Sequence, residues 1–192
     1  MSREILNKII RNRKTIYPKQ FSGEELSKDL INEILENAIH APTHKMTQPW
    51  FFKVYKGESK GELSSLIKKI DQEKFSKVKI DKFIDKINFS DTIISICMNR
   101  DKDNKVPEWE EIAAISMAVQ NIWLSCYVNN IGSYWSSSPL KDEYGKLEKL
   151  DINQRCLGFF FMGSYDHKES SKSRDNLEDK VDNIYKCRKI KI

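Results

Sequence analysis

The chain has 192 residues, 32% of them charged and 39% hydrophobic, and a formal net charge of +5 from 33 basic and 28 acidic side chains. This length supports one well-buried core and no comfortable division into two domains. Basic and acidic residues interleave, as over 68–74, so the charge forms no basic stripe of the kind that nucleic-acid-binding proteins carry. No apolar run approaches the ~20 residues of a membrane span, and the first residues lack the pattern of a signal peptide. We therefore expect a cytoplasmic globular protein.

The cysteines lie far apart in the sequence and show no paired spacing. Three of them fall within apolar runs, which favours buried free thiols over a metal site or disulfides. No histidine has a cysteine or carboxylate at a metal-binding spacing, so no metal site is predicted. The cysteines are Cys97, Cys126, Cys156 and Cys187.

The N-terminal part predicts two helices joined by a turn. Apolar residues over 5–10 mark one face of a short first helix, and Pro18 prevents its continuation. Ser22 followed by Glu25 has the spacing of a capping box, which predicts a second helix from Ser22 to about His40.

The remaining chain predicts strands that alternate with helices. The strands are almost continuously apolar, which indicates burial on both faces of a sheet. The longest helix is apolar around more than one face, which indicates a central place or contact with a second chain. Residues 58–90 are lysine-rich with a thin apolar stripe, so we expect this segment to be the most mobile. The expected elements are strands over 51–56, 92–98 and 155–162, a strand and turn over 133–139, and helices over 58–90, 108–130 and 141–147.

These elements predict an α+β fold, with a single domain over residues 1–192 in which helices flank a central sheet in three layers. The sequence predicts more helices than a sheet of so few strands can cover. A homodimer that shares the long helix would solve this problem.

The stretch from His40 to Tyr55, HAPTHKMTQPWFFKVY, is the first candidate for a binding site. Pro42 ends the preceding helix, and the apolar run from Trp50 begins a buried strand. A loop held at both ends can present backbone amides and short side chains to a ligand. Its histidines, threonines and glutamine suit a flat ligand with polar edges. The alternative is a plain helix–strand connection with a solvated loop.

Two separate basic groups form the second candidate. Arg13 and Lys14 follow the first helix, whereas Lys172 and Arg174 lie in the polar tail. Guanidinium and phosphate pair through charge-assisted forked hydrogen bonds, so the two groups could close on one phosphate. The alternative is two solvated charge runs.

Several catalytic and nucleotide-binding signatures are absent from the sequence. It contains no GxGxxG, no GxxxxGK[ST] and no GxSxG motif. Acid–base or nucleophilic catalysis therefore has no obvious set of residues, and a cofactor that brings its own reactivity is the better interpretation.

Together, these segments resemble the nitroreductase family of FMN-dependent oxidoreductases. The R-R-S-like triplet of the family is matched by Arg13-Lys14-Thr15, and its A-P-S-x-x-N-x-Q-P-W stretch by residues 41–50. Its turn after the long central helix is matched by residues 132–137, and its closing K-S-R-like element by residues 172–174. The H-K before Q-P-W and residues 105–110 look most like the small, single-domain bacterial branch.

The resemblance implies a nitroreductase-like three-layer fold with a mostly antiparallel sheet, and a homodimer whose interface contains the long helix and two FMN molecules. It implies a tail (164–192) that contacts the cofactor or the partner subunit, and it allows residues 58–90 to serve as a mobile helical lid. By position, the resemblance assigns three cations to the FMN phosphate: Arg13, Lys172 and Arg174. It assigns Lys14 and Thr15 to the ribityl chain and pyrimidine edge, and Trp135, Ser136 and Ser137 to the reactive side of the ring. The residues that would line the flavin from the other subunit are His40, Thr43, His44, Met46 and Gln48.

The implied activity is hydride transfer from NAD(P)H through flavin N5 to a nitroaromatic, quinone or similar flat electrophile by a ping-pong mechanism, with no side chain required as proton donor. Alternatives are an FMN enzyme with other chemistry, such as reductive dehalogenation or flavin breakdown, and a basic non-enzymatic binding module.

Two positions depart from the family pattern: Met46 replaces the usual Asn, and Tyr17 stands where a basic residue often lies near flavin N1. Without a cation from Lys14 or Lys45 near N1, the reduction potential of the flavin should be lower.

Overall fold

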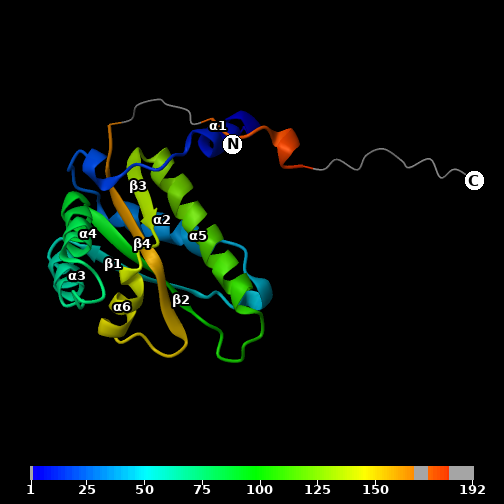
Figure 1. Cartoon of the computed structure of the whole chain (residues 1–192). Helices are drawn as coiled ribbons and strands as arrows, with labels where there is room; N and C mark the ends of the chain where they lie inside the picture. Colours follow the sequence, from blue (N-terminus) through cyan, green and yellow to red (C-terminus); the bar gives the residue numbers. More distant parts are fainter. Residues whose placement is uncertain (1, 167–172, 182–192) are drawn as a thin grey trace, which may run out of the picture.

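A single sheet with helices on both faces makes up the body of the molecule (Figure 1). The computed structural model describes residues 2–166 and 173–181. In the described part the sheet has four strands in the order β1-β2-β4-β3, and every neighbouring pair is antiparallel. In chain order the elements are α1 (Arg3–Asn12), the 3₁₀ turn η1 (Pro18–Gln20), α2 (Lys28–Ile39), the 3₁₀ turn η2 (His44–Met46), β1 (Trp50–Lys56), α3 (Ser59–Lys68), α4 (Lys77–Phe89), β2 (Thr92–Asn99), α5 (Glu108–Val128), β3 (Ile131–Ser136), α6 (Leu140–Leu147), β4 (Gln154–Ser164) and the 3₁₀ turn η3 (Leu177–Asp179).

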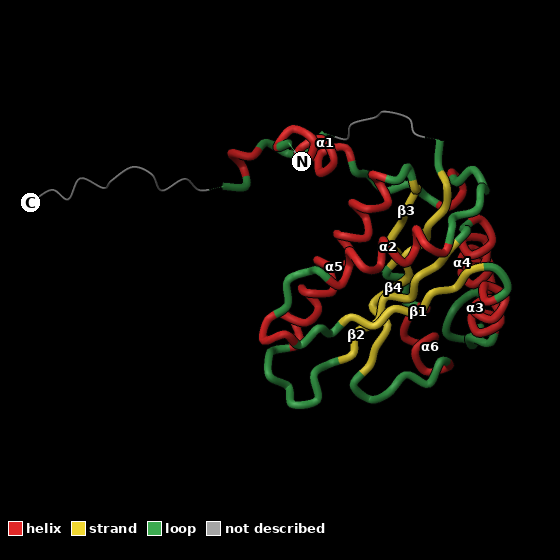
Figure 2. The backbone as a smooth tube through the Cα atoms, turned by 180° about the vertical axis from the view of Figure 1, so that it is seen from behind, coloured by secondary structure: helices red, strands yellow, loops and turns green. Residues whose placement is uncertain are grey.

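Alternation along β4 builds the two halves of the core. Successive side chains of a strand point to opposite faces, and Phe160 and Met162 join the cluster with α2 and α5. Phe159 and Phe161 join the cluster with α3, α4 and α6 on the other face. All four are fully buried, and Figure 2 shows the two helical layers on either side of the sheet. The predicted three-layer α+β fold is confirmed. The central strands β2 and β4 are buried on both faces as expected, whereas the edge strand β1 is mostly only half-buried.

The second helix begins later than the capping-box pattern predicts. α2 starts at Lys28, and its N-cap is Ser27, whose hydroxyl accepts a hydrogen bond from the Leu30 amide at 3.2 Å. The predicted start at Ser22 is wrong, because Ser22 donates its amide to the Ser164 carbonyl at the end of β4, at 2.8 Å.

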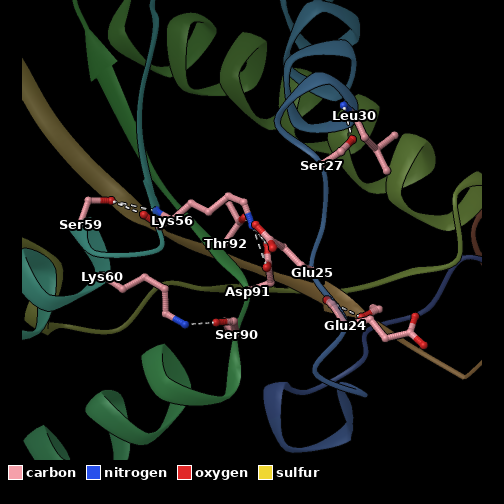
Figure 3. A network of polar contacts seen from close by, with 11 residues as sticks. Glu24, Glu25, Ser27, Leu30, Lys56, Ser59, Lys60, Ser90, Asp91 and Thr92 are labelled. Carbon is pink, nitrogen blue, oxygen red and sulfur yellow. Dashed lines mark hydrogen bonds and ion pairs between the residues drawn. The ribbon is translucent and has the colours of Figure 1, made fainter.

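Tertiary contacts hold the residues before α2 in an extended path (Figure 3). Lys56 at the end of β1 contacts Glu25 at 3.2 Å and Asp91 at 2.8 Å. The Ser164 hydroxyl donates to the Glu24 carbonyl at 2.7 Å. A capping interaction is worth only about 1 kcal/mol, so these long-range contacts override the local helix-start signal.

Residues 58–90 form two packed helices, α3 and α4. Each buries an apolar stripe against the sheet, with Leu63, Ile67 and Phe83 all 2% exposed or less. The mobile lid that this segment was expected to provide stays a prediction. No helix in the described ranges combines the length and the apolar character that crossing a membrane requires.

α1 lies at the periphery and has no buried residue. Its apolar residues Ile5, Leu6 and Ile10 are 51%, 43% and 49% exposed. Such a face is what a second chain would cover, and the homodimer stays a prediction. Cys97, Cys126 and Cys156 are free and buried, as expected, whereas Cys187 lies outside the described residues.

Candidate functional site

The segment after α1 runs along the open edge of the sheet. Ile16 donates its amide to the Ser133 carbonyl of β3 at 3.0 Å, and β3 is the last strand on that side. Residues 13–17 therefore have a fixed position beside β3 and the C-terminal half of α5, and the basic residues that follow α1 are held in place by backbone pairing.

Arg13 is a half-buried cation that stacks on the ring of Trp123 in α5, with 4.6 Å from its guanidinium carbon to the ring centroid. Its Nη1 is buried and has no hydrogen-bond partner among the described residues. Burial, and then the positive charge of Arg174, lower the pKa of Arg13 from its ordinary value. Arg174 thus lies within electrostatic range of Arg13, while Lys172 lies outside the described residues. The assignment of these residues to one phosphate stays a prediction.

Two cavities open beside this segment. Lys14 lies with its ammonium 5.9 Å from the centroid of the Tyr165 ring, at a small cavity of about 20 Å³ that Arg13 also lines. A larger cavity of about 310 Å³ lies between η1 and α4, within the size range of small-molecule sites. Its lining residues are Tyr17, Pro18, Lys19, Lys82, Asp85, Lys86 and Phe89.

Aromatic and basic groups meet next to the larger cavity. The rings of Tyr17 and Tyr134 lie 4.9 Å apart between centroids, and the Lys86 ammonium lies 5.0 Å from the centroid of Tyr134. Lys45 is one of the two residues named above as a possible source of positive charge near flavin N1, and in the single chain its ammonium donates to the Lys105 carbonyl at 3.1 Å.

The end of β3 approaches β4 closely. Ser136 is buried, Trp135 is half-buried and Ser137 is exposed. The Nε1 of Trp135 is buried without a hydrogen-bond partner in the described part of the chain. Gly158 of β4 permits this approach, because a Cβ there would lie 2.6 Å from the Ser136 carbonyl oxygen.

The loop that contains η2 has an unusual backbone. Lys45, Met46 and Gln48 have φ values of +49°, +54° and +46°, a region that residues other than glycine rarely adopt and that is enriched at functional sites. The Thr43 hydroxyl accepts a hydrogen bond from the Gln48 amide at 3.1 Å and lies 3.2 Å from the Thr47 hydroxyl. Internal hydrogen bonds therefore hold this compact turn, as the expectation of an anchored loop requires.

His44 ties the loop to the first turn of α5. Its Nδ1 lies 2.5 Å from Oε2 of Glu110. His40 is exposed and contacts Glu36 at 3.6 Å, and Met46 is 71% exposed. The loop thus presents polar and flexible side chains outward from a fixed backbone.

One chain does not bring the two candidate clusters together. Arg13 packs on Trp123, whereas His44 bonds to Glu110. These two positions on α5 are separated by about 20 Å at 1.5 Å per helical residue. Within the described ranges, no group of three or more His, Cys, Asp or Glu side chains is placed to hold a metal ion.

Sequence reasoning missed several residues that complete these clusters. Trp123 and Glu110 lie on α5, and Lys86 lies on α4. Each meets its partner only through tertiary packing, and their spacing in the sequence carries no signal of it. Tyr165 lies near Lys14 and follows β4, in a stretch where the sequence indicates only a polar tail.

Comparisons with known proteins point to one family and fold. The model of the nitroreductase family matches residues 10–164. YdjA of Escherichia coli K12, provisionally named an NAD(P)H nitroreductase, is 27% identical over 156 residues, covering 78% of this chain and 81% of YdjA. The nitroreductase-like family protein from Bacillus cereus has a TM-score of 0.84 at 25% identity, covering 94% of this chain and 96% of that one. A provisionally named nitroreductase from Desulfovibrio desulfuricans, solved in complex with FMN, has a TM-score of 0.73 at 19% identity, covering 97% of this chain and 100% of that one.

Proposed function

Because the chain belongs to the nitroreductase family, we propose that it is an FMN-dependent oxidoreductase that takes hydride from NAD(P)H and passes it to a flat electrophile such as a nitroaromatic or a quinone. The names of its relatives support both cofactors: YdjA is named for NAD(P)H, and the Desulfovibrio desulfuricans protein was solved with FMN. The observation that carries the proposal is the buried Nη1 of Arg13, which has no hydrogen-bond partner among the described residues and lies within electrostatic range of Arg174.

A phosphate fits this cationic cluster. Two guanidinium groups held close together repel each other, and a phosphate monoester brings about −1.5 to −2 charges. The buried Nη1 of Arg13 has no acceptor among the described residues, and an unsatisfied buried donor costs about 1–3 kcal/mol. A phosphate oxygen would satisfy this donor and separate the charges. Arg13, Arg174 and Lys172 would thus hold the FMN phosphate.

The cavity beside η1 suits the ring system. Tyr17 and Tyr134 supply aromatic surface, and Lys86 supplies a positive charge next to them. When bound, FMN would supply the hydride chemistry. By the family pattern, the flavin would also contact a set of residues that lie outside the lining of this cavity: Lys14, Thr15, Trp135, Ser136 and Ser137. Lys86 would favour negative charge at the pyrimidine edge.

A second copy of the chain would complete each site. Since the loop residues His40, Thr43, His44, Met46 and Gln48 lie far along α5 from Arg13, we propose that they reach the flavin of the partner subunit. One cleft between the chains would then receive NAD(P)H and the acceptor in turn, which is a ping-pong cycle.

The test of the proposal is flavin retention and activity in Arg13→Gln. The purified wild type should be yellow, contain FMN, and oxidise NAD(P)H with a nitroaromatic or a quinone. Loss of a charge-assisted contact worth about 1.5–3 kcal/mol should weaken FMN binding by about 10-fold to 150-fold, as measured by equilibrium titration. Arg11→Gln, an exposed position in the last turn of α1, should retain wild-type affinity. A wild type that stays colourless with added FMN would refute the proposal.

The acceptor assay also separates the alternatives. A protein that binds FMN and oxidises NAD(P)H but reduces neither acceptor class, while releasing halide from a halogenated aromatic, would be a dehalogenase of the same fold. Retention on heparin at low salt without flavin absorbance would favour the non-enzymatic binding module.

A further inference from the structure

A histidine–carboxylate pair stands on the loop that carries the predicted flavin contacts. His44 Nδ1 lies 2.5 Å from Glu110 Oε2, and the side chains are 58% and 23% exposed. The imidazole therefore has one nitrogen fixed by a carboxylate, while most of its surface faces outward. This is the arrangement in which a second residue fixes the tautomer and orientation of a histidine.

The loop around this pair is built to hold the imidazole still. Three of the four residues after His44 adopt positive φ values: Lys45, Met46 and Gln48. The Lys45 ammonium donates to the Lys105 carbonyl at 3.1 Å. Two side chains from one turn thus reach two points at or near the start of α5. Strained backbone that is fixed by tertiary contacts is characteristic of residues that act on a ligand.

We propose that His44 is the proton donor to the acceptor and that Glu110 is its positioning residue. This inference rests on the proposed function and deepens it, because reduction of a quinone or nitro group requires protons as well as electrons. It replaces the expectation that water alone supplies the proton.

The step balances as follows for a quinone. The acceptor receives one hydride equivalent, that is, two electrons and one proton, which originates from NAD(P)H. The imidazolium Nε2–H bond breaks, a new O–H bond forms on the second oxygen of the acceptor, and His44 becomes neutral. A proton from solvent then restores the imidazolium. NAD(P)H is oxidised, the quinone is reduced to the hydroquinone, and no other reactant is needed.

The charged groups near His44 come from three segments. Glu110 on α5 is its ion-pair partner. Lys45 is its neighbour in the loop, and Lys105 precedes α5 with its ammonium paired to Asp101 at 3.3 Å and Asp103 at 3.2 Å. Glu110 is thus the carboxylate that bonds directly to the imidazole and holds it in place.

The experiment compares two acceptors on enzyme that has been reduced beforehand with NAD(P)H and mixed rapidly with acceptor. A quinone needs protons, whereas ferricyanide takes electrons and needs none. For His44→Gln, the ratio of the quinone rate to the ferricyanide rate should fall by about 100-fold or more, the usual scale of general acid catalysis. FMN content, measured by absorbance, corrects both rates for any loss of cofactor.

The pH profile identifies the group and its partner. The wild-type quinone rate should fall as pH rises, because a general acid must carry its proton, and His44→Gln should lose this dependence. Glu110→Gln should lower the quinone-to-ferricyanide ratio and change the pH profile of the quinone rate, because the carboxylate no longer holds the imidazole in place. Glu108→Gln, on the same helical turn but paired with Arg100 and Arg155, should behave as the wild type.

The outcomes are distinguishable. An active, flavin-containing wild type together with a His44→Gln variant of unchanged acceptor ratio and pH profile would overturn this inference alone. Equal loss of both rates after correction for FMN would also overturn it, because His44 would then position the acceptor and donate no proton. A wild type without flavin or NAD(P)H oxidation would overturn the proposed function and this inference with it.

Discussion

Gly158 is the residue at which the proposed site depends most directly on the backbone. Its φ of +150° is one that other residues rarely adopt, and a Cβ there would lie 2.6 Å from the Ser136 carbonyl oxygen and 2.8 Å from Trp135 Nε1. The close approach of β4 to the end of β3, and thus the position of Trp135 and Ser136, requires the absence of a side chain.

Gly158→Ala should destabilise the protein by about 2 kcal/mol or more, because the clash is with backbone that cannot rotate away. Urea unfolding of the variant and the wild type measures this difference. Gly61→Ala is the matched control, since a Cβ there meets nothing within 4 Å, and it should leave stability unchanged or raise it by about 0.5 kcal/mol. Equal stabilities of Gly158→Ala and the wild type would contradict the close packing of β3 on β4.

Among the elements, β1 and α6 are joined by a pair of buried phenols. The hydroxyls of Tyr55 and Tyr144 lie 2.7 Å apart, and the side chains are 7% and 0% exposed. Burial, as the largest cause, raises the pKa of Tyr55 and of Tyr144 above the ordinary value of a tyrosine. Both phenols therefore stay neutral in the folded protein at a pH where an unfolded chain ionises.

The free energy of unfolding should accordingly fall as pH rises above about 10, the pKa of an unperturbed tyrosine. A group whose pKa is raised in the folded state contributes stability that is complete below its unfolded-state pKa. This stability is lost as pH rises above that pKa, because only the unfolded chain then releases the proton. Tyr144→Phe should lose about 1 kcal/mol near neutral pH through its hydrogen bond, but its stability should decline less steeply with pH. Denaturant unfolding over a pH series tests both effects.

The exposed Tyr17 provides the control for the phenol pair. Tyr17→Phe should leave the free energy of unfolding near neutral pH unchanged, since Tyr17 is 54% exposed. A Tyr144→Phe variant with the wild-type slope would show that ionisation of the buried pair does not contribute to alkaline unfolding.

At the scale of the whole molecule, apolar surface on α1 and α5 points to a second chain. α1 has no buried residue, and Trp109 and Val128 near the two ends of α5 are 68% and 57% exposed. Exposed apolar residues along two adjacent helices are typical of an interface between subunits. The proposed site needs such an interface, because its two halves lie far apart along α5 in one chain.

Replacement of both Ile5 and Ile10 by Glu should convert a dimer into a monomer without unfolding it, since neither residue is buried in the single chain. Light scattering after size exclusion gives the mass, and circular dichroism reports the fold. The monomer should also lose FMN. Lys8→Glu, an exposed charged position on the same helix, should stay dimeric. A wild type that is itself monomeric, or a double variant that remains a dimer, would contradict the interface.

The order of the elements was predictable because each depends on a local pattern. The apolar run from Thr92 predicts β2, and the long apolar helix after Pro107 is α5, with both bounds close to those expected. The family was also recognisable, since the matching segments lie on separate short stretches of sequence. Ser22 shows the limit of local signals, because its helix-start pattern gives way to pairing with β4.

The sequence by itself determined which elements form, because the pattern of apolar residues along each of them is local. It also determined that the central strands β2 and β4 are buried on both faces, and that cations and an anchored loop are present. Only the tertiary structure decided which of these residues meet. Arg13 lies on Trp123 and beside Arg174, and His44 lies against Glu110, across gaps in the sequence that carry no periodic signal. The physical reason is that a repeat of two or 3.6 residues reports the local backbone, whereas contacts between distant side chains depend on how whole elements pack.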